Sequence, residues 1–218
     1  MLKINSEHIA QMEKYCRINL INSVAGYKSL NLLGTISPDG ITNLSVVSSA
    51  FHLGSNPPLI GIVMRPEREH NDTLKNIKDT GHYTLNNVQS EWLQQAHQTS
   101  ASYPSGVSEF DQCGFSKEYL PSFKAPFVRQ SSIRIGLELR DVIGMELNGT
   151  TIVIGEVMHI LTENEVIGDD GLVDHERAGT MAVTGLDAYY QPKFTERLAY
   201  AKPGITVSLK SEEVRLYP

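Results

Sequence analysis

Turn signals divide much of this chain into short runs of strand-forming residues, and this division constrains the fold more than any other feature. Residues 30–37 and 41–51 are two such runs, and Pro38-Asp39-Gly40 lies between them. Proline presets the φ angle of a turn, aspartate hydrogen-bonds to the backbone nearby, and glycine tolerates a positive φ angle. The pattern therefore predicts a β-hairpin.

A second hairpin is predicted in the other half of the chain. Residues 132–147 and 151–161 are both rich in apolar, strand-forming residues. Asn148-Gly149, which separates them, is the dipeptide most typical of a tight turn between antiparallel strands. Further strand-like runs lie at 59–64, 82–88 and 205–209, and we expect the last of them to close the barrel.

Three short helices are expected beside the strands. The first spans residues 6–15 and is capped by Ser6, and the second is capped by Asp72 and ends at Gly81. The third spans residues 90–98. Because helices do not alternate regularly with strands, a doubly wound parallel sheet is disfavoured. The predicted fold is mainly β, an antiparallel barrel with short peripheral helices.

Composition narrows the classes of partner. The chain carries a formal net charge of −6, whereas a protein that binds nucleic acid usually presents a basic surface. Its N-terminus lacks the apolar segment of a signal peptide, and no apolar run reaches the ~20 residues that span a bilayer. Two isolated cysteines, Cys16 and Cys113, are typical of a protein from a reducing compartment. A single disulfide bond between them is the alternative. We expect a soluble, cytoplasmic protein that binds neither nucleic acid nor membrane.

The sequence lacks the common catalytic and metal-binding motifs. Its seven histidines form no H-x-x-x-H or H-x-H pair, so no metal site is predicted. Neither a G-x-S-x-G nucleophile motif, a Walker A loop nor a G-x-G-x-x-G dinucleotide motif occurs. The candidates for function therefore lie within residues 43–76.

Residues 43–49, with the sequence NLSVVSS, combine strand-forming residues with short polar side chains. They could form an edge strand whose polar face meets solvent. They could also form the wall of a ligand site, since short side chains let a flat ring approach the backbone and offer hydrogen bonds to it. Composition alone leaves both interpretations open.

The next candidate segment has the features of a phosphate site. Arg65 and Arg68 precede the expected start of a helix, and Thr73 lies in its first turn. A helix N-terminus offers free N–H groups and a partial positive charge, and guanidinium groups add charge-assisted hydrogen bonds. A solvated charged loop is the alternative, because Glu67 and Glu69 lie in the same segment.

Taken in order, the motifs of residues 34–88 resemble the flavin reductase-like FMN-binding split-barrel family. That family shows a D-G turn, N-x-A/S-x-x-S, D/N-P-P before an apolar strand, and D-T-x-x-N-I before a strand that ends in asparagine. This chain has the corresponding residues in the same order: Asp39-Gly40, 43–48, Asn56-Pro57-Pro58, 72–77 and Asn87. Residues 184–189 (TGLDAY) are also similar to a small-residue segment of the family that ends in tyrosine.

The resemblance implies an antiparallel split barrel that forms a homodimer and binds FMN near the subunit interface. One domain is expected over residues 1–218, with the barrel core at about 25–210. The ring and the ribityl chain of FMN would face Asn43, Ser45, Val46 and Ser48, and its phosphate would meet Thr73. The expected cofactor-binding residues are Asn43, Ser45, Val46, Ser48, Arg65, Arg68, Asp72, Thr73 and Asn76.

Two positions depart from the family pattern. Asn71 stands where a lysine usually precedes Asp-Thr, so the positive charge for the phosphate is expected from Arg68, with Arg65 as a further candidate. Ala50 stands where many members carry an aromatic residue, a role that Phe51 could take.

The function implied by the resemblance is that of a reductase in which NAD(P)H reduces bound FMN, which passes electrons to an acceptor. No catalytic side chain is predicted, because the cofactor supplies the hydride chemistry. Residues 100–127 and Tyr189 are expected to cover the open face of the flavin. His52 or His159 is either a flavin neighbour or a structural strand residue. Two alternatives stay open: an FMN-bearing electron carrier without NAD(P)H activity, and a barrel that holds another phosphate ligand, such as pyridoxal phosphate, or haem.

Overall fold

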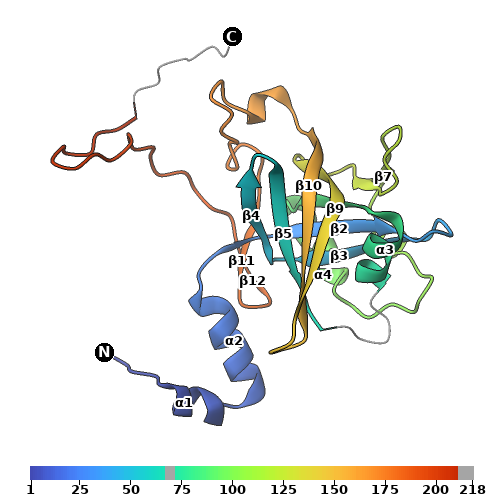
Figure 1. Cartoon of the computed structure of the whole chain (residues 1–218), viewed down its shortest axis with the longest axis horizontal. Coiled ribbons are helices and arrows are strands. Elements are labelled where there is room, and N and C mark those ends of the chain that lie inside the picture. The colour runs from blue at the N-terminus through green and yellow to red at the C-terminus, as the bar shows by residue number, and fades with distance from the viewer. Residues whose placement is uncertain (67–71, 211–218) are drawn as a thin grey trace.

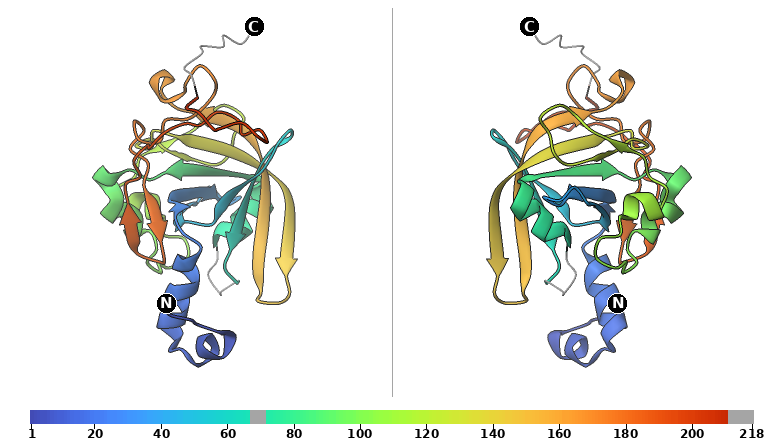
Figure 2. Two further views of the ribbon diagram at one scale, coloured as in Figure 1. Left: turned by 90° about the vertical axis from the view of Figure 1, so that its left-hand side faces the viewer. Right: turned by 90° about the vertical axis from the view of Figure 1, so that its right-hand side faces the viewer.

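Seven strands form the main sheet of the protein, in the order β3-β2-β6-β9-β10-β5-β4. The computed structural model describes residues 1–66 and 72–210. Each pair of neighbouring strands is antiparallel, and the sheet curls into a barrel (Figures 1 and 2). The mainly β, antiparallel prediction is therefore confirmed. The strands are β2 (Asn31–Ile36), β3 (Thr42–Val47), β4 (Ala50–Ser55), β5 (Pro58–Met64), β6 (His82–Asn87), β9 (Arg134–Met145) and β10 (Thr150–Leu161).

The two edges of this sheet, β3 and β4, follow one another in the chain. β3 ends at Val47 and pairs with β2, whereas β4 begins at Ala50 and pairs with β5. Only Ser48 and Ser49 join them. The expectation of one strand over residues 41–51 is therefore wrong. These residues favour strands, but the chain crosses between the two edges at this point, which is the split in the barrel.

Both expected hairpin turns are present. Between β2 and β3, the N–H of Ser37 donates to the carbonyl oxygen of Ile41 (2.8 Å), and Gly40 has a φ angle of 87°. Between β9 and β10, the N–H of Gly149 donates to the carbonyl oxygen of Met145 (2.8 Å), and Gly149 has a φ angle of 72°. Glycine at each turn supplies the left-handed conformation that the turn needs.

The N-terminal helices differ from the prediction. α1 (Ser6–Gln11) is capped by Asn5 rather than Ser6, because the Asn5 side chain accepts a hydrogen bond from the N–H of His8 (2.9 Å). A further helix, α2 (Lys14–Val24), follows it. The sequence pattern does not predict α2 because the helix has no apolar stripe, and none of its residues is buried. Both helices project from one end of the barrel (Figures 1 and 2).

α3 (Asp72–Thr80) packs against the barrel through the buried residues Leu74 and Ile77. Asp72 is its first residue, so it is not the N-cap; that position precedes it and lies outside the described residues. The helix ends at Gly81 as expected, since the N–H of Gly81 donates to the carbonyl oxygen of Ile77 (2.9 Å) at a φ angle of 75°. The expected third helix is present as η1 (Ser90–Trp92) and α4 (Leu93–Gln98).

Shorter elements surround the barrel. β1, β11 and β12 form a three-stranded sheet, and β7 pairs with β8. The long 100–127 segment contains α5 and β7 but is otherwise irregular. The bounds are β1 (Lys28–Ser29), α5 (Glu109–Gln112), β7 (Lys117–Glu118), β8 (Phe127–Val128), η2 (Asn164–Val166), β11 (Ala182–Thr184) and β12 (Ala188–Tyr190).

Residues 205–209 do not close the barrel, so this expectation is wrong. They are exposed and belong to an arm, residues 191–210, that extends away from the sheet (Figure 1). Within the described residues, their only bridge pairs Leu209 with Leu198 of the same arm. Their apolar alternation is that of a strand, but no edge of the main sheet takes them as a neighbour.

Two buried apolar clusters lie on opposite faces of β2. Leu32 packs in one of them with Trp92 and Phe110, whereas Leu33 packs in the other with Ile77. Successive side chains of a strand point to opposite faces, so β2 is covered on both sides. This packing anchors α3 and α5 next to β3, where both contact the strand.

Both cysteines are free, with Cys16 exposed and Cys113 buried, so no bridge joins them. In the part of the chain that the structure describes, no helix is long and apolar enough to cross a membrane. The same residues contain no group of three or more His, Cys, Asp or Glu side chains placed to hold a metal ion.

Candidate functional site

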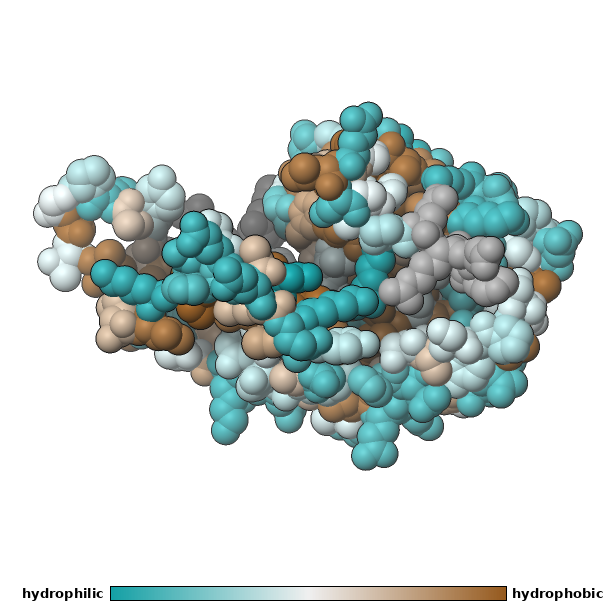
Figure 3. Space-filling model, turned by 90° about the horizontal axis from the view of Figure 1, so that it is seen from below, coloured by the Kyte–Doolittle hydropathy of each residue, from teal (hydrophilic) through white to brown (hydrophobic). Residues whose placement is uncertain are grey.

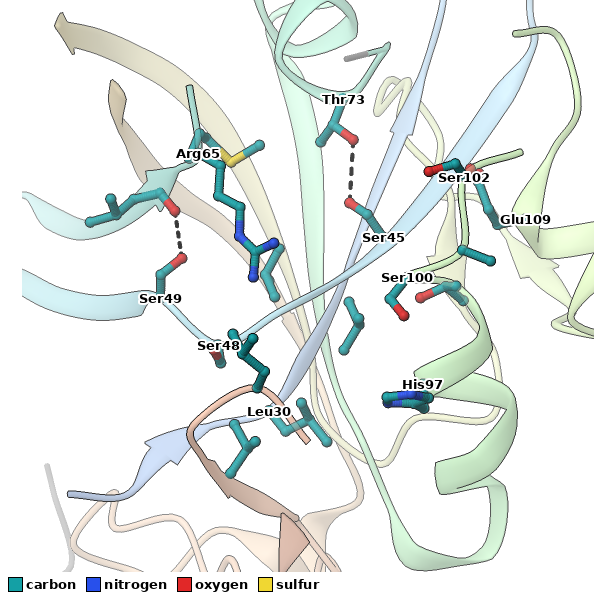
Figure 4. Close-up of a pocket in the computed structure, with 18 of the residues that line it drawn as sticks. Leu30, Ser45, Ser48, Ser49, Arg65, Thr73, His97, Ser100, Ser102 and Glu109 are labelled. Carbon is teal, nitrogen blue, oxygen red and sulfur yellow. Dashed lines mark hydrogen bonds between the residues drawn. The ribbon is translucent and has the colours of Figure 1, made fainter. Parts of the chain in front are cut away.

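A pocket of about 730 Å³ opens where the barrel is split (Figure 4). Its walls come from β3 and the crossing at residues 48–49, the end of β5, the start of α3, and residues 97–104 and 183–189. Pockets of roughly 300–1,000 Å³ are typical of small-molecule and cofactor sites. The crossing that interrupts the expected strand therefore shapes this candidate site.

Most of the expected cofactor-binding residues line this pocket: Asn43, Ser45, Val46, Ser48, Arg65, Asp72 and Thr73. Asn76 does not line it, because it lies behind the wall and is 3% exposed. Arg68 and Asn71 lie outside the described residues, so the expected contact of Arg68 with a phosphate stays a prediction.

Hydrogen bonds link the polar side chains of the strand wall. The Thr73 hydroxyl donates to Asn43 Oδ1 (2.7 Å), and the hydroxyl oxygens of Ser45 and Thr73 are 3.2 Å apart (Figure 4). Because the Thr73 proton is directed at Asn43, Ser45 donates to Thr73. Behind them, Asn76 Nδ2 donates to Thr35 Oγ1 (3.2 Å), and Thr35 donates to Asn43 Oδ1 (3.4 Å). Asn76 therefore supports the wall without lining the pocket.

A carboxylate fixes the orientation of the Asn43 amide. Glu109 Oε2 accepts hydrogen bonds from Asn43 Nδ2 (2.9 Å) and from the N–H of Leu44 (3.0 Å). Glu109 lines the pocket and is 8% exposed, and this burial raises its pKa. The sequence does not reveal Glu109, since it lies in the irregular 100–127 segment, far along the chain from the residues it contacts.

Two cationic side chains line the same pocket. Arg65 extends into it from the end of β5 (Figure 4), and Lys28 reaches it from β1. Within the described residues, neither side chain forms an ion pair or a hydrogen bond. Burial, followed by the nearby charge of Arg65, lowers the pKa of Lys28. Two unpaired cations in one pocket favour an anionic ligand. The sequence offers no motif that would identify Lys28.

The start of α3 belongs to the same pocket, since both Asp72 and Thr73 line it. The first N–H groups of a helix have no partner within it and carry a partial positive charge. The pocket therefore combines a hydroxyl, a helix N-terminus and cations, which is the donor set that a phosphate group requires.

The opposite wall is formed by residues 97–104 and Tyr189. The Tyr189 hydroxyl is hydrogen-bonded to His97 Nδ1, and the two rings meet edge to face with centroids 5.7 Å apart. Burial raises the pKa of Tyr189. Tyr189 and the first part of the 100–127 segment thus line the pocket, whereas β7 lies outside it, and their covering of a flavin stays a prediction.

The strand histidines and Phe51 are not part of the pocket. His159 packs edge to face against Phe123, with ring centroids 5.3 Å apart, and His52 is exposed beside Ser55. The Phe51 ring lies over Gly61. Neither histidine lines the pocket, which fits the structural interpretation of both, and the aromatic role considered for Phe51 stays a prediction.

An antiparallel split barrel with a polar pocket at the split defines the class of this protein. Residues 28–180 match the flavin reductase like domain, and the chain therefore belongs to the flavin reductase-like family. The resemblance read from the motifs is confirmed at the level of family and fold.

Solved structures agree with this assignment. A split-barrel protein from Shewanella frigidimarina NCIMB 400, assigned as a flavin reductase, is 42% identical with a TM-score of 0.89, covering 92% of this chain and 100% of that one. Nitrilotriacetate monooxygenase component B from Bacillus cereus shares the fold at 18% identity and a TM-score of 0.78, over 89% and 97% of the two chains. Flavoredoxin of Desulfovibrio vulgaris (Miyazaki F) shares it at 22% identity and a TM-score of 0.67, over 82% and 91%.

Proposed function

We propose that the protein binds FMN in the pocket at the split and passes electrons from NAD(P)H through it to an acceptor. One observation carries the proposal: a wall of short polar side chains on β3, a helix start and two cations that form no ion pair with any described residue meet in a single pocket. The pocket suits a flat ring that carries a phosphate, and membership of the flavin reductase-like family supports the same ligand class.

The residues divide into two groups by the part of FMN that they would hold. Asn43, Ser45, Val46 and Ser48 offer hydrogen bonds and close backbone approach to the ring and the ribityl chain. The phosphate would be held by Thr73 and the N-terminus of α3, with charge from Arg65 and Lys28. Lys28 and Arg65 thereby offset the missing lysine at position 71.

FMN supplies the hydride chemistry when it is bound. The protein groups hold and orient it, and the bonded set of Asn43, Thr73 and Ser45 keeps the strand wall in one arrangement. Residues 97–104 and Tyr189 lie across the pocket from β3, where they would exclude water and leave room for the nicotinamide. No protein acid or base is required for the transfer.

Absorbance spectra test the proposal. The purified protein incubated with FMN is expected to retain a flavin spectrum after gel filtration. Anaerobic addition of NADH or NADPH is then expected to bleach this spectrum rapidly. A protein that retains no flavin would contradict both this function and an FMN-bearing carrier, and would favour a different phosphate ligand or haem.

The second candidate is an electron carrier that binds FMN without NAD(P)H activity. Its support is that flavoredoxin of Desulfovibrio vulgaris has the same fold and that the sequence contains no nicotinamide motif. A carrier would keep its flavin spectrum but bleach slowly or not at all with NADH and NADPH, while dithionite would reduce it fully.

We also propose that two copies of the chain form a homodimer in the cytoplasm. Ile152 pairs with Val63 on one side and with Ile143 on the other, which places three apolar residues in a row across β5, β10 and β9. Figure 3 shows apolar residues gathered in several places on the surface seen from below. Further exposed apolar residues lie in the same sheet and its turn: Phe51 and Leu53 on β4, Met145 at the end of β9, and Leu147 between β9 and β10. Exposed apolar area of this kind is typical of protein interfaces.

Sedimentation velocity tests the dimer. We expect a mass twice that of the 24.2 kDa chain at micromolar concentration, with or without FMN. A protein that sediments as a monomer over the whole concentration range would contradict the proposal.

A further inference from the structure

Glu109 is a buried carboxylate in the wall of the pocket that the proposed electron transfer does not use. It is the first residue of α5, and it is 8% exposed. Its Oε2 accepts hydrogen bonds only from neutral groups, the amide of Asn43 (2.9 Å) and the N–H of Leu44 (3.0 Å). Within the described residues, no lysine, arginine or histidine forms an ion pair with it. Burying a carboxylate without a counter-charge costs folding free energy. Glu109 is such a carboxylate, and it lies at the proposed ligand site.

The charges of the pocket are separated. Arg65 and Glu109 lie on opposite sides of it (Figure 4). The titratable groups that interact with Glu109 are Asp72 at the start of α3 and Cys113 at the end of α5. Burial raises the pKa of Glu109, the N–H of Leu44 opposes this rise, and the negative charge of Asp72 adds to it. The Asn43 amide opposes it further, and the thiol of Cys113 is itself held neutral by burial.

We propose that Glu109 tunes the flavin in this pocket: its charge lowers the midpoint potential, and it takes up a proton when the flavin is reduced. The inference rests on the proposed function. Glu109 acts here as an electrostatic and positioning residue, not as a catalytic one, and it transfers nothing to the substrate.

The charge balance of flavin reduction explains why an ionised Glu109 would lower the midpoint potential. Two electrons and one proton added to the ring of bound FMN leave it with a negative charge, and charge near the ring sets its electronics. The electrons come from the nicotinamide donor, or from dithionite in a titration. Ionised Glu109 repels the added charge, and this repulsion is relieved when the carboxylate takes a proton from solvent. At an effective dielectric constant of about 20 and within ~8 Å, two charges repel enough to change an equilibrium more than tenfold.

The effect depends on pH with a definite sign. Below the pKa of Glu109 the side chain is neutral, so wild type and the Glu109→Gln variant have the same potential. As the pH rises through this pKa, the wild-type carboxylate ionises, and its potential falls below that of the variant. Glutamine accepts the same two hydrogen bonds through Oε1, so the wall is kept while the charge is removed.

The test is a set of anaerobic reductive titrations of the FMN-loaded protein, with a reference dye, from the lowest pH at which the protein keeps its flavin up to about pH 8.5. At the upper end we expect Glu109→Gln to favour the reduced flavin about tenfold more than wild type, which is ~30 mV for a two-electron couple. The two curves are expected to converge at the lower end. Asp111→Asn is the matched control, because it removes a charge from the same helix on an exposed side chain that pairs with Lys117.

Proton uptake on reduction gives a second measurement. Reduction in weakly buffered solution with a pH indicator is expected to consume more protons per flavin in wild type than in Glu109→Gln where the curves diverge, because protons taken up by the ring itself are common to both proteins. Equal potentials at every pH would overturn the inference, and so would a difference that does not change with pH, which marks a purely structural role. Wild-type protein that binds no flavin would overturn the proposed function and this inference with it; flavin-loaded protein without the pH dependence overturns the inference alone.

Discussion

Replacing Arg65 by alanine is expected to weaken FMN binding roughly ten- to a hundredfold, with little change in riboflavin binding. A hydrogen bond to a charged group contributes about 1.5–3 kcal/mol, and each 1.4 kcal/mol is a factor of ten in affinity. Arg65 lines the same pocket as Thr73, from the end of β5, and its side chain forms no ion pair or hydrogen bond within the described residues. Removing this side chain therefore breaks no ion pair among the described residues, so the fold is expected to be unaffected.

Fluorescence titration of the apoprotein with FMN and with riboflavin measures both affinities. Riboflavin lacks only the phosphate of FMN. The ratio of the riboflavin dissociation constant to the FMN dissociation constant therefore measures how much the phosphate contact contributes to binding. Lys28→Met is expected to lower the same ratio by a smaller factor, since Lys28 is half-buried and its lowered pKa makes it lose its charge at a lower pH than an ordinary lysine. Arg129→Ala is the matched control, because the Arg129 side chain is 68% exposed and does not line the pocket. Equal losses for FMN and riboflavin would show that the phosphate lies elsewhere.

The strand wall of the site could be predicted because its residues are neighbours in the sequence. Asn43, Ser45 and Thr73 occur in two short motifs, and the hairpin of β2 and β3 and the start of α3 bring those motifs together. Local sequence was sufficient for each of these elements. Their mutual hydrogen bonds followed from the fold.

The other side of the pocket could not be predicted, because its residues meet through tertiary packing alone. Glu109 is 66 positions from Asn43 and lies in a segment with no periodic pattern. It reaches β3 because its neighbour Phe110 is buried in the cluster that contains Leu32. Lys28 is likewise placed by the pairing of β1 with β11, and no spacing in the sequence indicates that pairing.

The two errors in strand assignment have a shared cause. Residues 41–51 and 205–209 both have strand-forming composition, but composition does not specify a pairing partner. In the first case Ser48 and Ser49 carry the chain from one edge of the sheet to the other. In the second case the strand-like run lies on an arm outside the barrel. Pairing partners are set by the whole sheet, which a local pattern does not contain.

Replacing Gly34 by alanine is expected to destabilise the protein by about 3 kcal/mol, at the upper end of the usual effect of overpacking. A Cβ atom at this position of β2 would lie 2.6 Å from the carbonyl oxygen of Pro126 and 2.6 Å from Thr84 Oγ1. Neither atom can move freely, because the Thr84 hydroxyl donates to that carbonyl (2.7 Å) and accepts from Asn86 Nδ2 (2.9 Å). The segment that carries Pro126 would have to shift.

Denaturant unfolding followed by circular dichroism measures the loss, and Gly144→Ala is the matched control. Gly144 also lies in a strand, β9, but a Cβ atom there would have no neighbour within 4 Å. Alanine at an unstrained position restricts the unfolded chain, so this control is expected to be neutral or slightly stabilising, by ~0.4–1 kcal/mol. Equal free energies of unfolding for the two variants would contradict the close approach at Gly34. The Cβ atom at position 34 would also lie 3.4 Å from the Phe110 ring, next to Glu109, so FMN affinity is expected to fall together with stability in Gly34→Ala alone.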